Sequence, residues 1–181
     1  MKILKHAVGI VATLFFAFKG SLLGIAPPEE VRKWPVAFAL FFLLIIFLAV
    51  SALVRTVKGH RTIVWVAALG CAPLGWFLFR PYQTKTYALT FLWNGESYVK
   101  GEVLTQQAQE WKANNIQATD SELVSSFGGP DHKDRIWTPE SIAKARVEIT
   151  EKYILFVVPL LATVLFFLEG LVAPYEAQPP T

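Results

Sequence analysis

The feature that most constrains this chain is the stretch from Thr138 to Val172, which predicts a single helix with two chemically different halves. Thr138 is a good N-cap, Pro139 suits the first helical position, and Glu140 places a negative charge where the helix dipole favours one. From Tyr153 to Leu168 the stretch carries no charge and is apolar enough to enter a bilayer. We therefore expect one helix to join an extramembrane segment to a membrane.

The first half of this stretch has the two faces of an amphipathic helix. One face alternates in charge every four residues, a spacing at which each pair adds a few tenths of a kcal/mol, and another face is apolar at helical spacing. The charged positions are Glu140, Lys144, Glu148 and Lys152, and the apolar ones are Ile142, Ala145 and Ile149. Two interpretations stay open: a membrane helix that protrudes into water, or a rigid lever that carries a signal into the bilayer.

Composition favours a membrane protein over other classes. Of the 181 residues 54% are hydrophobic, and they gather in long runs, which indicates membrane insertion rather than one oversized soluble core. A formal net charge of +3 would suggest nucleic acid in a soluble protein. Here Lys and Arg flank the apolar runs, so we expect lipid headgroups as the partner and no nucleic acid. The single cysteine, Cys71, excludes an intrachain disulfide.

Four apolar runs predict a mainly α integral membrane protein with four transmembrane helices. The expected spans are about 7–26, 35–54, 62–79 and 153–172, and the first three form a membrane domain at 1–80. A secretory signal peptide is the alternative for the first run, but Lys19 interrupts it and cleavage after Ala26 would place Pro27 first. We expect an uncleaved span there, a long helix at 138–173 that contains the last span, and a disordered tail at 174–181.

Three residues inside these spans are candidates for a role within the membrane. Lys19 costs free energy in an apolar span unless its side chain reaches the interface, so a snorkelling lysine and a functional cation are both open. Pro73 lies among small residues and is interpreted either as part of ordinary helix packing or as a kink beside a binding cavity. Glu169 is a conceivable partner for Lys19, but the connectivity of the spans puts the two residues near opposite faces of the membrane.

Residues 81–137 predict a small α+β extramembrane domain between the third and fourth spans. Asn94-Gly95 is the preferred type I′ turn, and its flanks at 86–93 and 96–104 are rich in aromatic and β-branched residues, so we expect a β-hairpin. A short helix is expected at 105–114. The Thr119-x-x-Glu122 capping box predicts another helix, which Gly128-Gly129 closes.

The edges of this domain are predicted from its prolines and tryptophans. Arg80-Pro81 is expected to end the third span, and Pro81 to make that connection less rigid than the long helix. Residues 130–134 are expected to form a polar loop. A domain of this size has a marginal core of its own, so we expect it to rest on the long helix or the membrane surface through Trp93, Trp111 and Trp137.

The inventory of catalytic and metal-binding residues is small. The histidines fall in no helical metal-binding pair, and no Gly-rich loop has phosphate-binding spacing. Asp131, His132 and Asp134 are suitable metal ligands by type, although three residues on one polar loop are more typical of a solvated turn. We therefore expect no cofactor and no catalytic residues, and a role other than enzyme.

Function and orientation follow as hypotheses. The leading hypothesis is a non-enzymatic membrane protein whose 81–137 domain binds a protein partner or senses a condition. The alternatives are a transporter accessory or immunity-type protein that acts within the membrane, and a membrane-bound enzyme that uses the Asp131–Asp134 loop. In the short loops, the positive-inside rule favours a cell-membrane protein with both termini cytoplasmic and residues 81–152 outside the cytosol.

Overall fold

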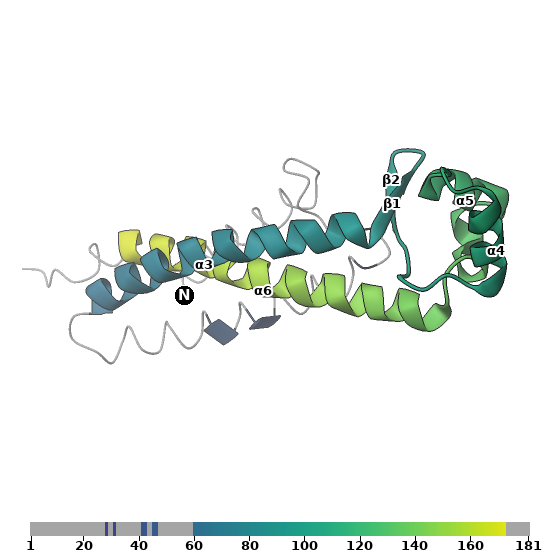
Figure 1. Ribbon diagram of the computed structural model, residues 1–181. Helices are drawn as coiled ribbons and strands as arrows, with labels where there is room; N and C mark the ends of the chain where they lie inside the picture. The colour runs from purple at the N-terminus through teal and green to yellow at the C-terminus, as the bar shows by residue number, and fades with distance from the viewer. Residues whose placement is uncertain (1–27, 29–30, 32–40, 43–44, 47–59, 173–181) are drawn as a thin grey trace, which may run out of the picture. The chain divides into compact units, whose positions relative to one another are not determined.

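The computed structural model describes residues 28, 31, 41–42, 45–46 and 60–172 (Figure 1). Its elements are α3 (His60–Ala88), β1 (Thr90–Trp93), β2 (Glu96–Val99), α4 (Gln106–Asn114), α5 (Asp120–Ser126), the 3₁₀ helix η1 (Pro130–Arg135) and α6 (Pro139–Val172). These residues form two compact units: the first holds 41–42, 45–46, 60–80 and 154–172, and the second holds 28, 31 and 81–153. The fold is mainly helical with one two-stranded antiparallel sheet, which confirms that part of the prediction.

Two helical stretches are long and apolar enough to cross a membrane, Thr62–Ala88 in α3 and Pro139–Phe167 in α6. Their uncharged parts are 62–79 and 153–168. The predicted span at 7–26 lies outside the described residues. The predicted span at 35–54 is described only at four positions, all of them helical: Phe41, Phe42, Ile45 and Ile46.

α3 is longer than the sequence predicts. The helix continues to Ala88, so Arg80 and Pro81, which are predicted to end the membrane span, do not end the helix. Proline removes one helical hydrogen bond, but its fixed φ is close to the helical value. The helix ends instead where the Thr90 Oγ1 donates a hydrogen bond of 2.7 Å to the carbonyl of Thr86.

α6 is one helix, as the capped and patterned sequence predicts. The Ser141 N–H donates to the Thr138 Oγ1 at 3.4 Å, and the Ser141 hydroxyl donates to the Thr138 carbonyl at 2.9 Å. The predicted apolar face is buried at Ile142, Ala145 and Ile149. This burial explains why the first turns of the helix are ordered without help from the membrane.

The hairpin forms around the predicted type I′ turn. Asn94 and Gly95 have φ values of 49° and 83°, which this turn requires at both central positions. The strands are shorter than expected, because residues 86–88 belong to α3 and β2 ends at Val99. The register pairs Phe91 with Tyr98 and Leu92 with Ser97.

The short helices confirm two further sequence signals. Thr105 caps α4, with the Ala108 N–H donating to its Oγ1 at 3.3 Å. In the capping box of α5, the Thr119 N–H donates to Glu122 at 2.7 Å, and the Glu122 N–H donates to the Thr119 Oγ1 at 3.3 Å. The Thr119 hydroxyl also donates to the Glu122 carboxylate at 3.0 Å, and the two bonds that this carboxylate accepts, from the Thr119 N–H and the Thr119 hydroxyl, lower the pKa of Glu122. Residues 130–135 form η1 rather than the expected loop, with Pro130 at its start.

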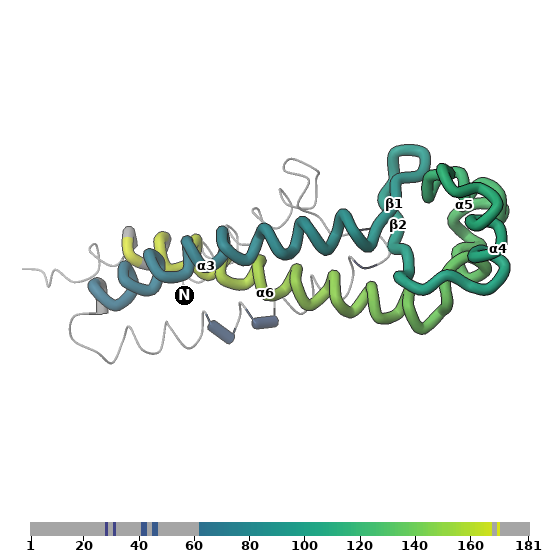
Figure 2. Tube along the Cα trace, in the orientation of Figure 1, coloured from purple at the N-terminus to yellow at the C-terminus, as the bar shows by residue number. Residues whose placement is uncertain are grey.

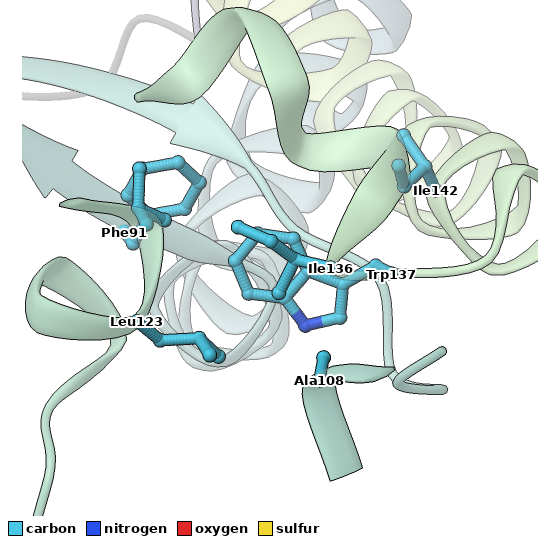
Figure 3. Close-up of a cluster of buried hydrophobic side chains, with 7 residues drawn as sticks. Phe91, Ala108, Leu123, Ile136, Trp137 and Ile142 are labelled. Atoms are coloured by element: carbon cyan, nitrogen blue, oxygen red, sulfur yellow. The ribbon is translucent and has the colours of Figure 1, made fainter. Parts of the chain in front are cut away.

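The core of the second unit is a cluster centred on Trp137 (Figure 3). It gathers side chains from the hairpin, α4, α5, the end of η1 and the first turn of α6: Phe91, Ala108, Leu123, Val124, Ile136, Trp137 and Ile142. Phe91 stacks between Tyr98 and Trp137, with ring centroids at 5.7 and 5.5 Å. Trp93 and Trp111 pack against this cluster, so the three tryptophans build the domain's own core, which also includes α6 through Ile142.

A backbone crossing places Trp137 in that core. Residues 103–105 run antiparallel to residues 136–138, with a β-bridge between Leu104 and Trp137. The Thr105 N–H donates to the Ile136 carbonyl at 2.8 Å, and the Thr138 N–H donates to the Val103 carbonyl at 2.9 Å. Residues more than 30 positions apart are thereby joined immediately before α6 begins.

In the first unit, α3 and α6 lie side by side (Figure 2). A Cβ at Gly75 would lie 3.2 Å from the Leu160 backbone nitrogen, so glycine permits the close approach of the two helices. Toward the other end of the pair, the Trp65 ring meets Phe167 edge-on at 5.3 Å. The central contact is a buried cluster of Val64, Ala68, Ala162 and Phe166.

Gly101→Ala tests the close packing between the hairpin and the start of α6. The added Cβ would clash with the Ser141 Oγ and lie 2.8 Å from the Trp137 Cβ. Overpacking of this kind costs about 1–3 kcal/mol, so thermal unfolding of the detergent-solubilised protein should shift to lower temperature. Gly70→Ala is the matched control, because its Cβ would meet nothing within 4 Å. Equal midpoints for the two variants would contradict this description.

Candidate functional site

The first candidate site lies in the second unit, where the ends of α3 and α6 meet beside the domain. Tyr82 and Tyr153 are buried there, with ring centroids 5.7 Å apart. Burial raises the pKa of Tyr82, so its hydroxyl stays neutral. The two tyrosines form an aromatic contact at Tyr153, the first residue of the uncharged segment of α6 and the last of its residues in this unit.

An ion pair joins α3 and α6 beyond the tyrosines. The Lys85 Nζ lies 2.7 Å from the Glu148 Oε1. This hydrogen bond raises the pKa of Lys85 and lowers the pKa of Glu148, and the charges of Lys152 and Lys144 lower the latter further. Glu102 acts on Lys85 in the same direction as Glu148. Glu148, a member of the predicted charge ladder on α6, thus pairs with a lysine of another helix.

The second candidate site is the tip of the hairpin. Leu92, Asn94, Gly95 and Glu96 are exposed, and Leu92 is 68% exposed although it is apolar. The tip presents an aliphatic side chain, the partly buried Trp93 and a carboxylate on a turn of fixed geometry. Such a combination suits contact with another protein, because aromatic side chains are enriched at protein interfaces, whose cores are apolar.

The hairpin is held in place from the α5 side. The Ser121 hydroxyl donates to the Leu92 carbonyl at 3.2 Å, and the Lys100 ammonium pairs with Asp120 at the start of α5. At the tip, the Tyr98 hydroxyl donates to Glu96 at 2.7 Å. These contacts fix both strands, so the exposed turn projects from a positioned support.

The third candidate, the Asp131–His132–Asp134 segment, forms an exposed turn of η1. His132 lies over Gly128, where an added Cβ would be 3.1 Å from the imidazole Cδ2. In the part of the chain that the structure describes, no three His, Cys, Asp or Glu residues come together as metal ligands would. At this turn the geometry gives the metal hypothesis no support.

The intramembrane candidates are described unequally. Lys19 lies outside the described residues, and so does any pairing with Glu169, whose backbone belongs to α6. Pro73 is exposed on α3, on the side away from the buried Ala68 and Gly75. Its proposed role beside a cavity stays a prediction.

Sequence reasoning missed the contact between α3 and α6, because it placed the end of the helix at Pro81. Lys85 lies beyond that boundary, four residues after Pro81. A signal was present: Tyr82, Thr86 and Leu89 follow Gly75 at spacings that keep them near one face of an extended helix. No protein-family model, curated protein or solved structure matches this chain.

Exchanging the charges of the ion pair tests whether Lys85 and Glu148 hold the helices together. Lys85→Glu should lower the unfolding midpoint, because the new carboxylate faces those of Glu148 and Glu102. The decrease should be small, because the original ion pair is partly exposed to solvent and therefore weak. Adding Glu148→Lys should recover part of the loss. A double variant no more stable than Lys85→Glu alone would show that the contact contributes nothing.

Proposed function

We propose that the protein is a non-enzymatic multi-pass membrane protein with four transmembrane helices, whose extramembrane domain binds a protein partner or responds to a condition. The two uncharged helical segments, 62–79 and 153–168, support a membrane location. The proposed orientation has both termini in the cytoplasm and residues 81–152 outside the cytosol. The charges of the short loops support that orientation.

The observation that carries the binding role is the exposed hairpin tip on a well-packed domain. The stack of Tyr98, Phe91 and Trp137 holds one face of the hairpin against the core. The opposite face leaves Leu92 in solvent beside the rigid Asn94-Gly95 turn. A surface ordered before contact loses less conformational entropy on binding than a flexible loop would.

A signalling role for α6 is part of this proposal. The core of the domain includes Ile142, and the same helix continues to Val172. A partner that shifts the hairpin would therefore act on a structure that shares its core with the first turn of α6. The alternative of a transporter accessory or immunity-type protein depends on Lys19, which lies outside the described residues, and on the Pro73 region of α3.

Photo-crosslinking tests the binding role directly. A photoreactive amino acid at Glu96, in the full-length protein in its native membrane, should yield a discrete crosslinked product. Leu92→Asp should reduce the yield by about tenfold or more at limiting partner, because losing a buried leucine contact costs roughly 1.5–3 kcal/mol.

Ile116→Asp is the control for this experiment. Ile116 is 83% exposed on the loop between α4 and α5, so the variant adds the same charge at a similar apolar position away from the hairpin. The crosslink yield should stay unchanged in this control. Equal yields for Leu92→Asp, Ile116→Asp and the parent would remove the hairpin from the binding role.

A further inference from the structure

α3 has an outer face that is apolar and exposed along the whole uncharged segment. Large side chains recur along it at helical spacing: Ile63, Val66, Leu69, Leu74, Trp76 and Phe77. Val66, Leu69, Trp76 and Phe77 are 64%, 72%, 71% and 73% exposed. In water, a continuous surface of this kind would be a strong drive to associate.

The opposite face of α3 is the one that contacts other helices. Val64, Ala68 and Gly75 are buried there, against α6. Ile46, from the predicted second span, packs against the same cluster of Val64, Ala68, Ala162 and Phe166. Among the described residues of the first unit, the helix contacts of α3 thus lie on this inner face.

The dimensions of the outer face match the hydrocarbon of a bilayer. No charge occurs between Arg61 and Arg80, and the 18 positions from 62 to 79 span about 27 Å at the helical rise. The hydrocarbon core of a typical bilayer is about 30 Å thick. Trp76 lies one turn from Arg80, where an aromatic belt is expected.

The residue types also differ between the faces. Ala67, Ala68 and Gly75 lie toward α6, and small residues are what closely packed transmembrane helices require. The outer face carries mostly large aliphatic and aromatic side chains, although Gly70 also opens onto it. Large apolar side chains are well suited to fluid acyl chains.

We propose that the outer face of α3 is in direct contact with the acyl chains of the lipid bilayer. This inference rests on the proposed membrane location and adds which surface of the protein the lipid covers. α3 is then a peripheral helix of the membrane part, and a second copy of the chain or another span does not cover this face.

Spin labelling of the full-length protein in phosphatidylcholine vesicles tests the proposal. On a Cys71→Ala background, single nitroxide labels are placed at Leu69→Cys and Val66→Cys, with Val147→Cys on the extramembrane part of α6 as the exposed control. Power saturation then compares collisions with oxygen, which concentrates in hydrocarbon, with those of a water-soluble nickel chelate. We expect several-fold higher accessibility to oxygen than to nickel at Leu69 and Val66, and the reverse at Val147.

Each other outcome has its own meaning. Low accessibility to both reagents at Leu69 and Val66 would show that protein covers the face, which overturns this inference but leaves the membrane location intact. High accessibility to nickel at those positions would place the face in water and overturn the membrane location as well. Circular dichroism of each labelled variant must match the parent, which ties the readings to the native helix.

Discussion

Residues 103–105 and 136–138 cross in antiparallel fashion, and the second unit is arranged around that crossing. Its hydrogen bonds join the end of the hairpin segment to the residue that caps α6. Trp137 is thereby turned into the core, where Phe91 stacks on it. Gly101 lets the hairpin segment approach Ser141 closely, so the hairpin and the start of α6 share one buried interface. The domain and the first turns of α6 are consequently parts of one structure.

This arrangement changes how the two connections to the membrane compare. The sequence favours α6 as the rigid connection because Pro81 is expected to interrupt the other one. The structure keeps α3 helical through Pro81 to Ala88, while α6 contains a proline of its own, Pro159. Proline leaves the carbonyl of Leu155, four residues earlier, without its helical partner, yet α6 continues past this position to Val172. Both helices are therefore continuous connections, and Lys85–Glu148 links them inside the second unit.

The sequence predicts local structure well where one residue type serves one backbone geometry. Asn94-Gly95 determines its turn, Thr105 and Thr119 cap their helices, and α6 begins at Pro139, directly after Thr138. These signals depend on neighbours within a few positions, so they can be recognised without the fold. The error at Pro81 has the same origin, because a local breaker was judged without the contacts of Tyr82 and Lys85 that hold the helix beyond it.

Long-range contacts were not predictable in the same way. The pairing of Leu104 with Trp137 joins two short segments without periodicity, and many other pairings would satisfy the same residues. The exposed Leu92 became a candidate for binding only once the register placed Phe91 and Tyr98 on the buried face. The candidate metal residues show the reverse: Asp131, His132 and Asp134 are suitable ligands by residue type, but the structure places them on an exposed turn.

Hydrogen exchange of the full-length protein in lipid nanodiscs tests the shared core most directly. If the crossing unites the domain with α6, then Trp137→Ala should accelerate amide exchange together in the hairpin, in α5 and at residues 142–150 of α6. Exchange in the uncharged segment of α6 should change little. Acceleration confined to the hairpin and α5, with 142–150 as protected as in the parent, would show that α6 stands alone and would contradict this account.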